Sequence, residues 1–366
     1  MPKRIISLIL FASFLAAPLA AEEGHEPGAH SEHAENAEKT EEHSFDLQAL
    51  LVHHLMDSVI IEWQPMGTKV YQDENPEAFA ADPYRRYTFK DDEGRLYKYE
   101  GGLPMHITRR VSMMFIVAFL MLIIFIPAAR KISSDPYRVQ GRFASAVEAL
   151  VQYLRKDVAE ANMHHPTPGY VGYIITAFVF IFLSNLLGLF PPFGEMVLMA
   201  KQLVTGAHHL GNHPAVGETD PALLMLWPGI TVTGDIAVTM SLAAITTLLI
   251  WVAGFHYQGY KFLWHVVPAG VPWPLYLLLW PIEFIVGPLA KGFALTIRLL
   301  ANMTAGHVLL LVIAGFIFKF QTWWMPIVSV TGMTALYVLE LLVALLQAFI
   351  FTLLSAIFIG LSMHRH

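Results

Sequence analysis

Long apolar runs alternate with short polar segments along most of this 366-residue chain. After Arg109 and Arg110 comes VSMMFIVAFLMLIIFIPAA, which is long enough to span a hydrocarbon core about 30 Å thick. Similar runs predict a second helix over about 170–190, ending before two prolines, and a third over about 230–254. The pattern therefore predicts helices that cross a membrane.

The last two apolar runs are too long for ordinary crossings. They extend from Trp273 to Phe318 and from Trp323 to Met363, and at about 1.5 Å per residue each helix would be about 60 Å or longer. Pro281, Pro288 and Gly292 can interrupt the first run. The simplest interpretation is a pair of long, steeply tilted helices that follow the curve of a partner. We therefore expect an all-α integral membrane protein with about five crossings.

The composition supports a membrane protein, because 55% of the residues are apolar and only 14% are charged. The net charge of −6 comes mostly from residues 22–100, where nineteen acidic residues stand against seven basic ones. No basic surface for nucleic acid is present. The chain has no cysteine, which excludes disulfides, thiolate metal sites and cysteine nucleophiles.

Three regions are expected. Residues 1–21 have the basic start, apolar core and small residues of a signal peptide, whether it is cleaved or kept as an N-terminal anchor. Residues 22–108 form an acidic extracytoplasmic segment that is disordered at first, with histidines that could collect metal ions, and that ends with two short strands predicted within 87–100. Residues 109–366 form the transmembrane domain.

Basic residues predict the orientation. The segment after the first crossing carries the strongest basic cluster of the chain and is placed in the cytoplasm by the positive-inside rule: Arg130, Lys131, Arg138, Arg142, Arg155 and Lys156. Within it, residues 143–158 could form an amphipathic helix along the membrane surface. Five crossings from an outside N-terminus put the C-terminus in the cytoplasm.

One arginine stands in the fourth apolar run. Arg298 and Asn302 are one helical turn apart on the same face, which is otherwise made mostly of alanine. Small residues let another helix approach closely in a membrane. A charge there costs between about 2.5 and 17 kcal/mol unless it is relieved, and a partner's carboxylate would relieve it and stay ionised beside it. The alternatives are a snorkelling arginine or a structural ion pair.

The last helix carries a second polar line. Glu340 and Gln347 share a face with Ala344 between them, because seven residues turn a helix back to nearly the same side. His307 lies nine residues from Arg298 and points to the opposite side of its own helix. His307 and Glu340 suit a water-filled proton path, although a hydrogen-bonded histidine and a glutamate paired with a lysine remain alternatives.

These residues stand in recognisable motifs. KGFALTIRLLANMTAGHVLL and the later LELLVALLQAFIFTLL resemble the paired helices of subunit a of F-type ATP synthases, with its Arg-Leu-X-X-Asn-Met-X-X-Gly core and Gln-Ala-Phe-Ile-Phe segment. FLSNLLGLFPP and TVTGDIAVTMSLA resemble the earlier spans of that family. The resemblance covers about residues 170–362, and the combination of motifs is specific.

The resemblance implies a proton-translocating stator subunit in the bacterial inner membrane, which forms two half-channels against the ring of c subunits and works with peripheral-stalk b subunits and the rest of the synthase. Arg298 would be the essential arginine facing the ring, with Asn302 and Gln347 near it. His307 and Glu340 would be the acid-histidine pair of the outer half-channel, at positions exchanged relative to some members. The exchange suggests that the two residues face each other.

Two other classes compete with this interpretation. An ion-coupled secondary transporter usually has internal repeats with interrupted helices, but only one interrupted region is visible here. A membrane metalloenzyme could use His164, His165, His208, His209 and His213, but these fall on opposite sides of the membrane and no His-Glu-X-X-His motif exists. No nucleotide-binding motif is present either. We therefore expect a non-catalytic subunit without a cofactor or metal.

Overall fold

A computed structural model describes the parts of the chain on which the fold rests. They are residues 59–61, 63–73, 89–90, 95–101, 105–134, 141–163, 166–190, 229–267, 271–320, 322 and 324–363. The predicted signal peptide, the acidic tail, the loop after the second crossing and the last three residues lie outside these ranges.

A small unit of short strands precedes the first long helix. Strand β1 (Val59–Ile61) pairs with β5 (Ile107–Thr108), and a three-stranded antiparallel sheet has the order β2 (Thr68–Tyr71), β4 (Leu96–Glu100), β3 (Phe89–Lys90). The two strands predicted within 87–100 are confirmed as β3 and β4. The sequence did not reveal that β2 adds to this hairpin on its other side.

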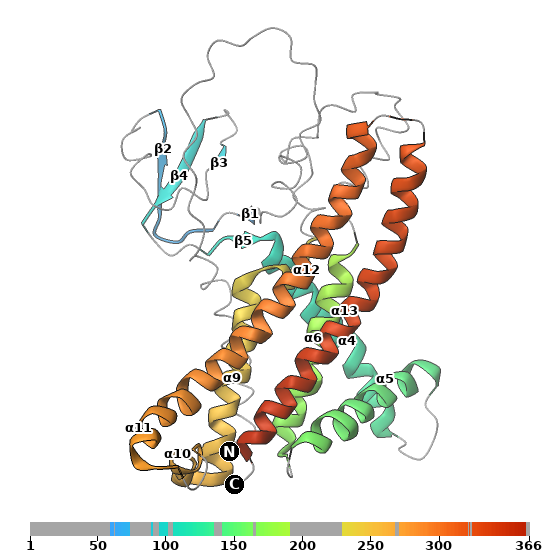
Figure 1. The fold of residues 1–366 in the computed structure, drawn as a ribbon. Helices are drawn as coiled ribbons and strands as arrows, with labels where there is room; N and C mark the ends of the chain where they lie inside the picture. Colours follow the sequence, from blue (N-terminus) through green and yellow to red (C-terminus); the bar gives the residue numbers. More distant parts are fainter. Residues whose placement is uncertain are drawn as a thin grey trace. The chain divides into compact units, whose positions relative to one another are not determined.

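The five predicted membrane helices are confirmed in length and composition. Figure 1 labels the α-helices. Their described bounds are α4 (Arg109–Ser134), α6 (Pro168–Gly188), α9 (Ile236–Gln258), the continuous run of α11 (Trp273–Pro281), η4 (Ile282–Val286) and α12 (Gly287–Phe320), and finally α13 (Met325–Met363). Helix α9 is extended by the short η3 (Gly259–Lys261) and α10 (Phe262–His265).

The third crossing begins later than the apolar run does. The expected start near residue 230 is wrong, because residues Val232–Gly234 form a 3-10 turn, η2, and the α-helix begins at Ile236. The Asp235 carboxylate accepts a hydrogen bond from the backbone N–H of Ala237 at 2.7 Å and caps the helix. Hydropathy alone does not reveal such a cap.

The two C-terminal helices are longer than a bilayer is thick. Helix α12 has 34 residues and α13 has 39, or about 51 and 58 Å at the α-helical rise. The two helices pack along each other, and both contact α9. Figure 1 shows them as an extended pair that crosses α6 and α9 diagonally. The prolines do not end the first helix, since the chain passes through a π-helical turn, η4, and continues.

The predicted amphipathic helix over 143–158 is confirmed as a helix. It consists of α5 (Arg142–Tyr153) followed directly by the π-helical η1 (Leu154–Glu160). Its position along a membrane surface stays a prediction.

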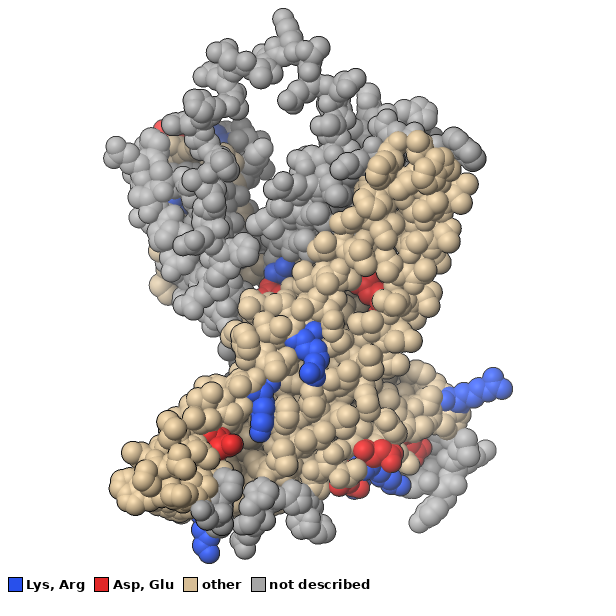
Figure 2. All heavy atoms as spheres, in the orientation of Figure 1, with Lys and Arg blue, Asp and Glu red and all other residues tan. Residues whose placement is uncertain are grey.

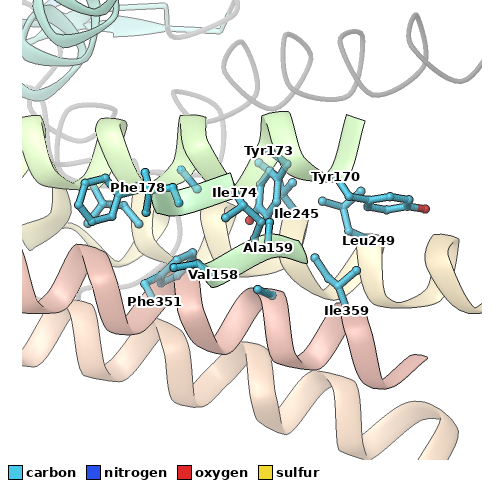
Figure 3. Close-up of a cluster of buried hydrophobic side chains, with 14 of the residues drawn as sticks. Val158, Ala159, Tyr170, Tyr173, Ile174, Phe178, Ile245, Leu249, Phe351 and Ile359 are labelled. Carbon is cyan, nitrogen blue, oxygen red and sulfur yellow. The ribbon is translucent and has the colours of Figure 1, made fainter. Parts of the chain in front are cut away.

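The buried core lies where α6, α9, α13 and η1 meet. Figure 3 shows aromatic and branched side chains of α6, among them Tyr173 and Phe178, facing residues of the other three helices. The Tyr173 hydroxyl lies 2.6 Å from the Thr246 hydroxyl of α9, so the most deeply buried tyrosine of this cluster is also hydrogen-bonded. This packing supports the inner sides of the two long helices.

One close approach fixes the end of α13. A Cβ atom at Gly360 would collide with the backbone carbonyl of Asn162, whereas a Cβ at Gly172 of α6 would meet nothing within 4 Å. We expect Gly360→Ala to destabilise the protein by about 1–3 kcal/mol through overpacking, and Gly172→Ala to be neutral or stabilising by up to about 1 kcal/mol. The thermal midpoints of the two purified variants measure this difference. Equal midpoints would contradict the packing described.

Candidate functional site

The arginine face of α12 is open within the chain. We use this name for residues on one side of the helix that are exposed, with only the first half-exposed: Lys291, Ala294, Arg298, Ala301, Asn302, Ala305 and Leu309. The other side of α12 is buried, with Leu299 and Met303 each 1% exposed. Among the described residues, the predicted alanine stripe is therefore an exposed surface and not a helix contact.

Arg298 has no counter-charge on the described residues. No acidic side chain in that part of the chain lies within ion-pair distance of it. Figure 2 shows that the surface over the long helices is mostly uncharged, with a few isolated basic and acidic groups on it. A guanidinium in such a setting requires water, lipid headgroups or a partner's carboxylate to offset its charge.

Glu340 is enclosed between the two long helices. Its side chain is 4% exposed and lies against Gly306 of α12, where a Cβ atom would collide with the carboxylate. Neither carboxylate oxygen has a hydrogen-bond partner among the described residues. Because an isolated buried carboxylate is strongly unfavourable when ionised, this group marks a polar position inside an apolar contact.

The five predicted residues thus occupy two environments. Arg298 and Asn302 lie on the open arginine face, whereas Glu340 and Gln347 lie on the buried side of α13, where Gln347 is 5% exposed. His307 is partly buried and directly follows the glycine that contacts Glu340. The structure therefore brings the stretch around His307 to Glu340, and it places Gln347 in the interior of the protein.

A buried polar group on α6 was not singled out from the sequence. Asn185 donates a hydrogen bond to the backbone carbonyl of Ala344 on α13 at 3.4 Å, and its side-chain oxygen accepts one from the Thr233 hydroxyl of η2. The neighbouring Ser184 and Thr231 hydroxyls are buried without a partner among the described residues. The signal that could have found this group was the Ser-Asn pair in an otherwise apolar span.

No metal-binding group is formed by the described residues, where no three histidine, aspartate or glutamate side chains gather. The five histidines weighed as metal ligands lie outside those ranges.

The fold and the site define a polytopic, all-α integral membrane protein with an open arginine face on one of two paired long helices. Residues 111–360 match the family model for the ATP synthase A chain. The chain therefore belongs to the ATP synthase A chain family and is a subunit of the membrane sector of an F-type ATP synthase.

The sequence similarity to individual relatives extends over nearly the whole chain. The protein is 33% identical to ATP synthase subunit a 2 of Prosthecochloris aestuarii over 94% of this chain and 87% of the relative. It is 33% identical to ATP synthase subunit a 2 of Chlorobium luteolum over 95% and 86%, and 32% identical to ATP synthase subunit a of Anaeromyxobacter dehalogenans over 95% and 78%. These alignments reach beyond residues 111–360, so these relatives share part of the N-terminal region as well.

Proposed function

We propose that this subunit is the stator that moves protons past the ring of c subunits and so couples proton flow to ring rotation and ATP synthesis. The observation that carries the proposal is the exposed Arg298, without a counter-charge on the described residues, in the middle of a stripe of alanine. A rotating partner with a carboxylate at the same depth fits both the shape and the charge of this face.

Arg298 has two roles in this mechanism. Its permanent positive charge favours the ionised form of the ring carboxylate that faces it, so an arriving proton must leave before the carboxylate passes. The same charge repels protons that would otherwise cross directly between the two half-channels. Asn302, one turn along the same face, can donate a hydrogen bond to the ionised carboxylate.

Glu340 and His307 belong to the outer half-channel in this proposal. The buried carboxylate of Glu340 has no hydrogen-bond partner among the described residues. Water molecules within hydrogen-bonding distance would satisfy its oxygen atoms. The Asn185 group is anchored to the Ala344 carbonyl, one turn from Glu340, and extends the polar environment to α6 and η2. Gln347, two turns along the same buried face, would stabilise the path from within.

The remaining parts of the proposal follow from the direction of proton flow. Protons enter from the outer side, ride the ring through almost a full turn and leave to the cytoplasm, driven by about 2.3 kcal/mol per elementary charge for each 100 mV. The N-terminal segment lies outside the cytoplasm and the C-terminus inside. Nucleotide chemistry takes place in partner subunits, and the b subunits of the peripheral stalk hold this chain against the turning ring.

Cross-linking tests which side of α12 meets the ring. The chain has no cysteine, so Ala301→Cys on the open face and Thr296→Cys on the buried face each introduce a single thiol. Ala301→Cys in the assembled synthase is expected to form disulfides with cysteines placed along the outer helix of the c subunit. Thr296→Cys, whose position is 2% exposed, is expected to form none. Equal cross-linking of both variants, or none at Ala301, would rule out the proposed contact face.

A further inference from the structure

A tryptophan of α9 holds the helix that carries Arg298. The Trp251 indole N–H donates a hydrogen bond to the backbone carbonyl of Phe284, in η4, at 3.0 Å. The two rings also lie against each other, with centroids 6.4 Å apart. Trp251 therefore contacts the π-helical turn that immediately precedes α12.

A proline interrupts the α-helical hydrogen-bond pattern at the Phe284 carbonyl. In an α-helix it would accept from the backbone N–H four residues later, but that residue is Pro288, which has no N–H. Backbone carbonyls without a partner are unfavourable inside a membrane. The Trp251 indole thus gives the Phe284 carbonyl a donor that an α-helical pattern would lack here.

A second contact between α9 and α12 lies one turn further along. A Cβ atom at Gly292 would collide with the Thr247 hydroxyl, and that hydroxyl lies 3.5 Å from the Pro288 carbonyl while donating to the Ala243 carbonyl at 2.9 Å. Gly292 is buried, whereas Arg298 is exposed. The two helices are therefore fixed to each other on the side of α12 away from the arginine face.

The rotation of α12 depends on how the proline segment is built. A π-helical turn holds one residue more than an α-helical turn, and one residue corresponds to a rotation of about 100°. If the segment Ile282–Val286 changed between the two forms, α12 would have to turn or slide against α9. The arginine face would then no longer point outward in the same direction.

We infer that Trp251 is a positioning residue for proton translocation: by supplying the hydrogen bond that Pro288 cannot make, it holds η4 in its π-helical form and sets the direction in which α12 presents Arg298. This inference rests on the proposed function of Arg298. In this role Trp251 acts through the backbone of η4 and does not contact the translocated proton.

A four-variant cycle tests the role of the indole. Trp251→Phe keeps an aromatic ring and removes the donor, Pro288→Ala restores the backbone N–H, and the double variant combines them. ATP-driven proton pumping in membrane vesicles is measured per assembled synthase. We expect Trp251→Phe to lose about tenfold, which is about 1.4 kcal/mol, and the double variant to pump within about twofold of Pro288→Ala, since an unsatisfied carbonyl no longer remains.

Trp280→Phe is the matched control. Its indole donates to the Leu263 carbonyl at 2.7 Å, which no proline has deprived of a donor, so Pro288→Ala is not expected to rescue this variant. The inference is overturned if Trp251→Phe pumps normally, or if its loss is the same with and without Pro288.

The thermal midpoint of the purified synthase separates positioning from simple anchoring. Pro288→Ala could restore the thermal midpoint of Trp251→Phe without changing its pumping. Trp251 would then be a structural residue, and the positioning role would be overturned. Arg298→Ala in the same vesicles tests the proposed function independently. Normal pumping by that variant would refute the function of Arg298, whatever the outcome of the Trp251 series.

Discussion

Replacing Arg298 by alanine is expected to abolish ATP-driven proton pumping. A guanidinium and a carboxylate about 4 Å apart interact by about 4 kcal/mol at an effective dielectric constant near 20, which corresponds to a factor of about 1,000 in a rate or an equilibrium. Because Arg298 has no competing carboxylate among the described residues, its charge is available to the partner. Pumping should therefore fall to the background of the vesicle assay.

Two further variants make this result specific. Arg298→Lys keeps the charge but loses the planar, forked donor group, so we expect it to retain more pumping than alanine while remaining well below the unmodified protein. Lys291→Ala removes a positive charge two turns away, where the Lys291 ammonium lies 5.2 Å from the Phe358 ring, and should have a much smaller effect. Pumping at the normal rate by Arg298→Ala would refute the central role of this residue.

Exchanging His307 and Glu340 is expected to restore activity that either single change removes. His307→Glu alone would put two acidic groups near each other in an apolar contact, and Glu340→His alone would leave two histidines without an acid. Each of these is unfavourable, because like charges and unpaired charges are poorly tolerated in a buried site. The double exchange keeps one acid and one histidine at the junction that Gly306 leaves open for the Glu340 carboxylate.

The measurement is again proton pumping per assembled synthase, with each single variant expected to lose at least about tenfold, or about 1.4 kcal/mol, because each leaves like or unmatched polar groups at a buried position. If both single variants pump normally, or if the double exchange recovers nothing, His307 and Glu340 do not act as a pair.

The gross fold could be predicted because the membrane imposes simple rules. Apolar runs of sufficient length must form helices there, since a lipid-exposed backbone must satisfy its own hydrogen bonds. The late start of α9 at Ile236 and the π-helical turn before Gly287 could not be read from hydropathy. An individual hydrogen bond lies at each point, one accepted by the Asp235 carboxylate and one donated by the Trp251 indole. An average of hydropathy over several residues does not report such single bonds.

The features of the site that lie on a single helix could be predicted from the sequence. Helical periodicity placed Arg298 among alanines, and the structure shows that side exposed. Periodicity also put Glu340 and Gln347 on one side of α13, but it could not tell whether that side is open or enclosed. That property depends on Gly306 of α12 and Asn185 of α6, which contact α13, with Thr233 of η2 hydrogen-bonded to Asn185. Contacts between distant segments are invisible to a pattern within one segment.

The alanine stripe beside Arg298 has a mechanical consequence. Alanine has no rotamers to lose when a surface is covered, so a partner sliding over Ala294, Ala301 and Ala305 meets no side chain that must reorient at each step. Under the proposed function, the free energy of the moving contact then stays nearly level along the alanines and changes near Arg298 and Asn302. The stripe would let the partner move past with little resistance from side chains, while electrostatic attraction acts at one place along it.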